Sequence, residues 1–172
     1  MGHAIDRRLI VRKGGEVVRT ALEHDALVKA DKSYLPEGRL RLDAPISDYL
    51  GREPWFSRLP NARVITVRQL MNHTSGLVRY EFKDEFTRDL TASPDRVWAP
   101  QDLIAYLLDA QPPFAAGAGW DYSDTNYIVL GMILERITGR AFYDEVERRL
   151  LTPHRLGHTR PSSSRVIAGL SQ

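Results

Sequence analysis

The stretch Trp120-Asp-Tyr-Ser-Asp-Thr-Asn-Tyr-Ile-Val-Leu-Gly131 decides the fold, because it opens the longest apolar helix that the sequence predicts. This helix is expected to run from Asp124 to Ile137, with apolar residues recurring at a spacing of about 3.5 residues. Other apolar residues fill the remaining faces, and Gly139 follows as the stop. A helix that is apolar nearly all round belongs in a protein core. We therefore expect the rest of the chain to pack around this helix.

Shorter helices are predicted on both sides of the central one. Thr66 and Gln69 have the spacing of a capping box, which predicts a helix that begins there and stops at Gly76. Residues 100–110 begin with a proline, which fits the first turn of a helix. Residues 141–150 have the pattern of a further amphipathic helix.

The remaining segments predict a hairpin and loops. Residues 9–21 have two apolar runs around Gly14-Gly15, which is typical of a β-hairpin with a two-residue turn. Residues 22–37 show no clean period and are expected to form a short helix or a loop. Residues 78–97 are charged and aromatic without a steady period, which predicts a long surface loop. The predicted fold class is α/β (α+β).

Composition excludes several classes of protein. The 172 residues are 42% hydrophobic and 27% charged, as in an ordinary globular domain, and no apolar run is long enough to cross a membrane. A net charge of +2 gives no argument for a nucleic-acid partner. The lack of cysteine excludes disulfides, thiolate nucleophiles and cysteine-based zinc sites. The first residues lack the apolar core of a signal peptide, so a cytoplasmic location is expected.

Three separated segments carry a resemblance to a known family. The first is Gly38-Arg-Leu-Arg-Leu-Asp-Ala-Pro-Ile-Ser-Asp-Tyr-Leu50, and the second is Ile65-Thr-Val-Arg-Gln-Leu-Met-Asn-His-Thr-Ser-Gly-Leu77. The third is the stretch 120–131, with Tyr122-Ser-Asp124 in the place of a Tyr-x-Asn box. Together they resemble the serine β-lactamase-related family, which includes class C β-lactamases, D-Ala-D-Ala carboxypeptidases and related esterases. The likeness covers roughly residues 9–20 and 37–160.

The resemblance implies both a fold and a chemistry. The fold would be mainly the helical part of a β-lactamase-like domain, with an N-terminal hairpin and a truncated sheet, as one partial domain over residues 1–172. The implied chemistry is acyl transfer, in which the serine of a Ser-x-x-Lys motif attacks an ester or amide carbonyl. In such a site the lysine and the box tyrosine handle the serine's proton, and a Lys-Thr-Gly or His-Thr-Gly strand helps to form the oxyanion pocket.

Two of these three catalytic elements are not found in the sequence. No serine has a lysine three residues further on, and residues 22–37 are too few for the family's usual connection plus its nucleophile helix. Gly157-His-Thr-Arg160 matches a loop of the family rather than its third box, which is not found after it. We therefore expect a homologue of these hydrolases with impaired catalysis.

Tyr122 and Asp124 are the candidate catalytic residues, as a vestigial Tyr-x-Asn box. A helix N-terminus stabilises a phenolate by only about 0.3–1 kcal/mol. An ionised Asp124, where the family has Asn, accepts hydrogen bonds only and raises the pKa of a neighbouring tyrosine. We therefore expect Tyr122 to be neutral at pH 7. Ser123 and Asp124 are also interpreted as caps of the helix that follows.

Other readings of the chain stay open. A working esterase or peptidase would have to use another serine, for which Ser33 is the candidate, and a split enzyme would take its missing parts from another chain. His73 and Ser75 could form a base and nucleophile, although a capped turn is the preferred interpretation. A catalytic triad would need one of His24, His73, His154 or His158, but the chain has no Gly-x-Ser-x-Gly elbow.

The expected partners follow from these readings. A small-molecule acyl substrate and a homodimer through the hairpin edge are expected, without a cofactor, a nucleic acid or a membrane span. His154 and His158 could bind a metal if they lay on a helix, but Pro153 and Gly157 argue against one. The aromatic residues 80, 82 and 86 would line either a substrate mouth or a packed loop.

Overall fold

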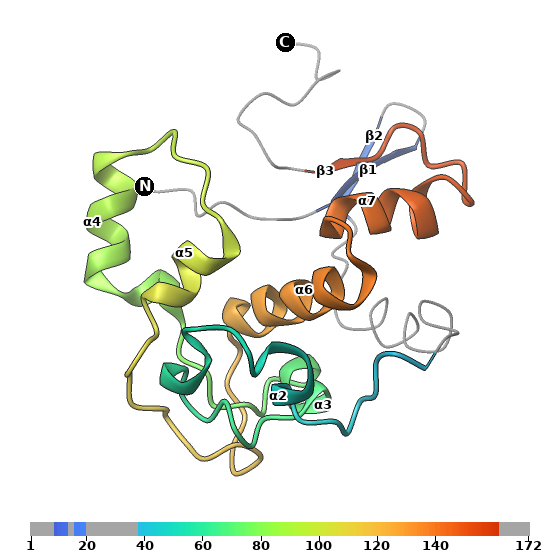
Figure 1. The fold of residues 1–172 in the computed structure, drawn as a ribbon. Helices are drawn as coiled ribbons and strands as arrows, with labels where there is room; N and C mark the ends of the chain where they lie inside the picture. Colours follow the sequence, from blue (N-terminus) through green and yellow to red (C-terminus); the bar gives the residue numbers. More distant parts are fainter. Residues whose placement is uncertain (1–8, 14–15, 20–37, 162–172) are drawn as a thin grey trace.

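The computed structural model describes residues 9–13, 16–19 and 38–161, and this part of the chain is mainly helical (Figure 1). Its centre is α6 (Asp124–Thr138), which confirms the predicted apolar helix and extends it by one residue. α6 ends at Gly139, which takes a left-handed φ of 69°. Ile128, Val129 and Ile133 are buried on the helix, which therefore forms the middle of the core.

α2 (Ser47–Leu50), η1 (Phe56–Arg58) and α3 (Val67–Met71) form the part of the molecule below α6 in Figure 1. The capping box at the start of α3 is confirmed, because the Thr66 hydroxyl accepts from the Gln69 amide while the Gln69 side chain accepts from the Thr66 amide. The predicted stop at Gly76 is wrong, since the helix ends at Met71. The Asn72 side chain accepts from both the amide and the hydroxyl of Thr74, which competes with continued helix formation.

The segment expected as a surface loop over residues 78–97 is instead partly helical. It contains η2 (Tyr80–Phe82) and α4 (Asp84–Ala92). α4 buries one large residue, Phe86, whose ring lies 5.4 Å from the Trp98 ring and 5.5 Å from the Tyr106 ring. Only Phe86 and, four residues later, the partly buried Leu90 pack against the core from α4, and two apolar positions are too few to stand out as a period in the sequence.

α5 (Pro100–Ala105) begins at the predicted proline but ends five residues before Ala110. The chain then continues in turns, in which Leu107 is buried and Asp109 takes a left-handed φ of 62°. The Asp109 amide donates to the Arg58 carbonyl at 2.8 Å, and the Asp109 carboxylate pairs with the Arg58 guanidinium at 2.6 Å. These contacts to η1 hold the chain in turns where the apolar pattern predicted further helix.

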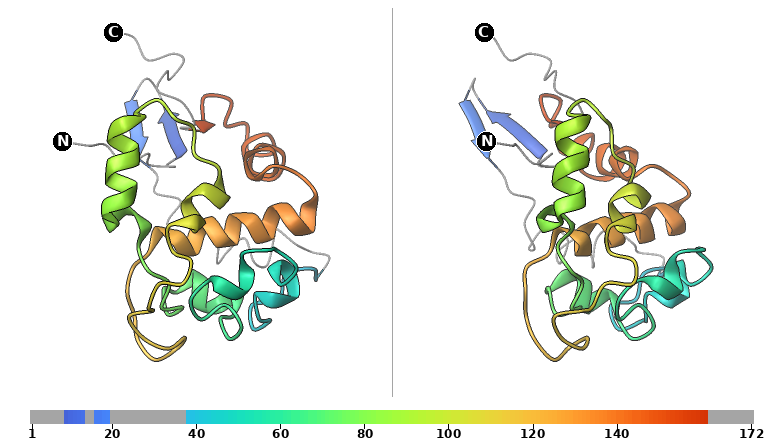
Figure 2. Two further views of the ribbon diagram at one scale, coloured as in Figure 1. Left: turned by 60° about the vertical axis from the view of Figure 1, so that its left-hand side comes forward. Right: turned by 90° about the vertical axis from the view of Figure 1, so that its left-hand side faces the viewer.

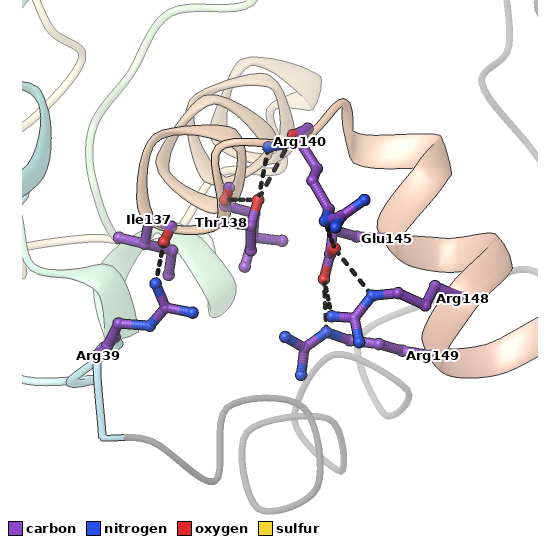
Figure 3. Close-up of polar contacts among 8 residues, drawn as sticks. Arg39, Ile137, Thr138, Arg140, Glu145, Arg148 and Arg149 are labelled. Carbon is purple, nitrogen blue, oxygen red and sulfur yellow. Dashed lines mark hydrogen bonds and ion pairs between the residues drawn. The ribbon is translucent and has the colours of Figure 1, made fainter.

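α7 (Phe142–Val146) follows α6 and continues into the π-helical segment η3 (Glu147–Leu151), where one α-helix was predicted. Glu145 lies near the junction of α7 and η3, with its side chain 9% exposed. Arg140, Arg148 and Arg149 surround its carboxylate at 3.5, 2.8 and 2.5 Å (Figure 3). On the other side of the α6 terminus, Arg39 donates to the Ile137 carbonyl at 2.6 Å.

Three strands complete the described residues. β1 (Leu9–Lys13) pairs antiparallel with β2 (Glu16–Arg19), and β3 (Arg160–Pro161) pairs with the start of β1, in the order β2-β1-β3. Figure 2 shows these strands on the opposite side of α6 from α2 and α3. The Gly14-Gly15 turn lies outside the described residues, so the two-residue turn stays a prediction, as does the truncation of the sheet.

The main core joins α6 to the helices below and beside it. Its fully or almost fully buried members include Ile46, Leu50, Ile65, Val67, Leu70, Leu77, Ile104, Leu107, Val129 and Ile133. A smaller cluster around Val146 and Leu151 lies at η3. None of the helices in the described ranges is long and apolar enough to cross a membrane.

Candidate active site

Tyr122 lies just before the first residue of α6, with its side chain 44% exposed. Its hydroxyl donates to Oδ1 of Asp124 at 2.6 Å. Ser123 is the N-cap residue by backbone geometry, but the predicted side-chain cap is wrong for both residues. The Ser123 hydroxyl donates to the Val78 carbonyl at 3.2 Å, and the Asp124 carboxylate accepts from Tyr122. Tyr122 and Asp124, the two candidate catalytic residues, therefore hydrogen-bond to each other, and neither side chain caps the start of α6.

The surroundings of Tyr122 favour its protonated form. Partial burial, then the hydrogen bond to Asp124 and the Asp124 charge, raise the pKa of Tyr122 above its ordinary value. The Arg79 guanidinium does lie over the ring, 5.6 Å from its centroid. That cation is paired with the Glu81 carboxylate at 2.7 Å, and the Glu81 charge also raises the Tyr122 pKa. Tyr122 is thus a hydrogen-bond donor at neutral pH.

His73 and Ser75 lie two positions apart in sequence, and neither side chain bonds to the other. The Ser75 hydroxyl accepts from the Leu77 amide at 3.1 Å, as the interpretation of a capped turn predicted, and donates to Oδ1 of Asn126 at 2.5 Å. Ser75 is completely buried. The His73 Nδ1 atom accepts from the Ser123 amide at 3.3 Å. A hydroxyl that donates to a buried amide is poorly placed to act as a nucleophile.

Asn126 is the residue of this site that the sequence analysis missed. It is completely buried in the first turn of α6, where its side chain lies between Ser75 and His73. Its Nδ2 atom is 3.0 Å from the His73 Nδ1 atom. The signal that could have found it is a lone amide within an apolar run, since buried polar side chains need hydrogen-bond partners.

Exposed aromatic residues flank Tyr122. Trp120 is 67% exposed, and Phe82 is 69% exposed with the Arg79 guanidinium 4.2 Å from its ring centroid. The aromatic residues 80, 82 and 86 do not form one mouth, because Phe86 is buried in the core and Tyr80 packs against its ring at 5.0 Å. Of the three, only Phe82 is an exposed neighbour of the site.

The other candidates are four residues, of which the structure describes two. Ser33 and His24 lie outside the described residues. His154 and His158 are exposed in the turns after η3. Within residues 9–13, 16–19 and 38–161, no group of three or more His, Cys, Asp or Glu side chains is arranged to hold a metal ion.

Comparison with known proteins gives a consistent family. The family model described as Beta-lactamase matches residues 34–165. Penicillin-binding protein 4 of Amycolatopsis lactamdurans is 33% identical over 118 residues, which are 67% of this chain and 28% of that protein. The teichoic acid D-alanine hydrolase of Staphylococcus aureus is 25% identical over 131 residues, or 74% of this chain and 28% of that one.

Solved structures show the same relationship. The D-stereospecific amidohydrolase of a Streptomyces species superposes with a TM-score of 0.65 at 35% identity, covering 77% of this chain and 39% of that one. Such neighbours support an α/β fold of the β-lactamase type. The chain therefore spans between about a quarter and two fifths of the length of the relatives that it matches.

Proposed function

Because this chain belongs to the beta-lactamase family of serine hydrolase homologues, we propose that it carries the tyrosine side of an acyl-transfer site and is catalytically impaired as it stands. The observation that carries the proposal is the hydrogen bond from the Tyr122 hydroxyl to Asp124. A tyrosine whose single hydroxyl proton is held in a hydrogen bond to a carboxylate is a neutral phenol rather than a base.

The energetics support this assignment. A tyrosine that takes the nucleophile's proton must be ionised near pH 7, and lowering its pKa from about 10 to about 7 requires roughly 4 kcal/mol. The helix dipole supplies at most about 2 kcal/mol. Burial and the Asp124 carboxylate act in the opposite direction at Tyr122, and Glu81 neutralises the nearby Arg79.

The serines point to the same conclusion. The printed sequence has no Ser-x-x-Lys motif. Ser75 and Ser123, which belong to the hydrogen-bonded surroundings of Tyr122, are completely buried and donate to Asn126 and Val78. In the part of the chain that the structure describes, the serines at this site thus have their hydroxyl protons committed to other groups. We propose that residues 1–172 form a partial domain of the family fold.

The proposed ligand is a small acyl compound. The matched relatives are named as a penicillin-binding protein, a teichoic acid D-alanine hydrolase and a D-stereospecific amidohydrolase. An ester or amide of a D-amino acid, or a β-lactam, is therefore the class that we propose for this site. The exposed residues Trp120 and Phe82, together with the Tyr122 hydroxyl oxygen as an acceptor, are the groups available to such a ligand.

Hydrolysis of D-alanine amide and of an acyl p-nitrophenyl ester by the purified chain tests the proposal. Tyr122→Phe is the matched control, because it removes one oxygen and keeps the ring. We expect the native chain and this variant to release product at the same background rate. Turnover by the native chain that Tyr122→Phe abolishes would overturn the proposal and favour a working hydrolase. Turnover that appears only on adding a second polypeptide would instead favour a split enzyme.

A further inference from the structure

We propose that His73 is a positioning residue, whose neutral imidazole holds the segment carrying Tyr122 through an unprotonated Nδ1 atom. Any effect of this arrangement on ligand binding rests on the proposed function of Tyr122. The hydrogen bonds themselves do not depend on that function. His73 is 5% exposed and lies in the turn that follows α3.

His73 contacts the backbone on both sides of Tyr122. Its carbonyl oxygen accepts from the Asp121 amide at 3.1 Å, and its Nδ1 atom accepts from the Ser123 amide at 3.3 Å. The imidazole ring also lies against the Tyr122 ring, with 4.6 Å between the centroids. One residue therefore holds the amide of Asp121, the amide of Ser123 and the Tyr122 ring that lies between them in sequence.

The hydrogen-bond directions determine which imidazole nitrogen carries the proton. The Leu77 amide can only donate, so it donates to the Ser75 hydroxyl, which in turn donates to Oδ1 of Asn126. With its oxygen assigned to Ser75, the Asn126 amide presents Nδ2, a donor, to Nδ1 of His73. The Ser123 amide donates to the same atom. Two donors converging on Nδ1 require that it be unprotonated, which places the proton on Nε2.

The backbone of His73 adopts a conformation that is uncommon for any residue other than glycine. Its φ is +60°, in the left-handed region that glycine and asparagine tolerate best. The residue is thus kept in a conformation that costs free energy, while its ring makes contacts with Tyr122 and, at 5.3 Å, with Tyr127. Because the backbone strain and the ring contacts have opposite effects on stability, substitutions at His73 can separate the two.

Three substitutions at His73 make that separation. His73→Asn keeps an acceptor near the place of Nδ1 and tolerates the left-handed conformation. His73→Gly tolerates the conformation but has no acceptor, and His73→Ala lacks both advantages. All three keep the backbone carbonyl that accepts from Asp121, so the Asp121 amide serves as an internal control for the Ser123 amide.

Amide hydrogen exchange measured by NMR gives the readout. We expect exchange at Ser123, relative to Asp121, to accelerate at least about tenfold in His73→Gly and in His73→Ala, and to stay within about threefold of native in His73→Asn. His73→Gly should nevertheless melt at a higher temperature than His73→Ala, because the left-handed strain on alanine outweighs the larger conformational entropy that glycine loses on folding. Native protection of Ser123 in His73→Gly would overturn the proposal.

A measurement on the native chain avoids any dependence on folded variants. Long-range nitrogen–proton NMR of the histidine rings should show Nδ1 of His73 as the unprotonated nitrogen at pH 7, with the signal assigned from its loss in His73→Asn. A proton on Nδ1 would overturn the proposal. Neither measurement uses turnover, so an active enzyme would refute the proposed function and leave this arrangement standing.

Discussion

The Tyr122 hydroxyl and the Asp124 carboxylate are joined by a hydrogen bond of 2.6 Å across one intervening residue. The position that would be an amide in the family's Tyr-x-Asn box is here a carboxylate, which accepts the hydrogen bond from the tyrosine hydroxyl. This pair lies at the start of α6, beside the exposed rings of Trp120 and Phe82. It accounts for a tyrosine that remains protonated at the start of α6.

Asp124→Asn should lower the pKa of Tyr122 relative to the native chain. The substitution removes the carboxylate charge and its acceptor bond, two of the causes that raise the pKa, and leaves burial in place. Carbon-13 NMR of the tyrosine Cζ atoms during a pH titration checks this, with the signal assigned by Tyr122→Phe. Asp121→Asn is the control, because it removes an exposed neighbouring carboxylate that does not bond to the Tyr122 hydroxyl. Equal titration curves for native and Asp124→Asn would contradict the prediction.

Gly76→Ala should destabilise the fold more than Gly139→Ala. Both glycines have a left-handed φ, of 72° and 69°, which costs an alanine about 1–2 kcal/mol. A Cβ atom at Gly139 meets nothing within 4 Å, whereas one at Gly76 would meet the Phe114 carbonyl oxygen and lie 2.7 Å from Nδ2 of Asn61. The steric conflict should add about 1–3 kcal/mol to the loss in free energy of unfolding. Similar urea midpoints for the two variants would show that the turn at Gly76 adapts.

Glu145→Gln should lower the free energy of unfolding by about 1 kcal/mol at pH 7, since the surrounding arginines are partly exposed and screened. The hydrogen bond from Arg148, followed by that from Arg149, lowers the pKa of Glu145 from 4.5 to about 2. A lowered pKa stabilises the fold above the unfolded value of 4.5, and this stabilisation is lost as the pH falls through about 2.

The difference in free energy of unfolding between the native chain and Glu145→Gln should therefore be largest at pH 6–7, decrease below pH 4.5 and vanish near pH 2. Urea unfolding at a series of pH values measures it. Glu147→Gln, which removes an exposed carboxylate two residues away, is the control for the general loss of negative charge. A difference in free energy of unfolding that stays constant from pH 7 to pH 2 would contradict the ion pairs assigned to Glu145.

The outer edge of β2 should pair with a second copy of the chain. Among the described residues β2 bonds only to β1, while β3 covers Leu9 and Ile10 on the other edge of β1. The expected homodimer through the hairpin edge would therefore use the outer edge of β2. Exposed strand edges favour pairing between chains. Hydrogen exchange at residues 16–19 should slow as the protein concentration rises, and strong protection in a dilute monomer would argue against this dimer.

The predictable parts of the fold are those that local sequence determines. α6 was predicted because its apolar residues recur over four turns and a glycine follows them. The capping box at Thr66 was predicted because both of its hydrogen bonds join residues three apart. Each of these signals is contained in a short window of sequence.

The parts that were missed depend on contacts between distant residues. α4 is placed by Phe86 against Trp98 and Tyr106, and no pattern within residues 84–92 reports that contact. The site depends on hydrogen bonds from Ser75 to Asn126 and from Ser123 to His73, which join residues about fifty positions apart. The sequence identified Tyr122 and Asp124 by resemblance, but their bond to each other became visible only in the structure.

Covalent labelling tests the central claim most directly, namely that this chain alone does not form an acyl-enzyme. The intact protein would be incubated with a fluorophosphonate and, separately, with a penicillin, and its mass measured before and after. We predict an unchanged mass with both reagents. A stoichiometric adduct that peptide mapping places on Ser33 or on any other serine, and that Tyr122→Phe suppresses, would contradict the account.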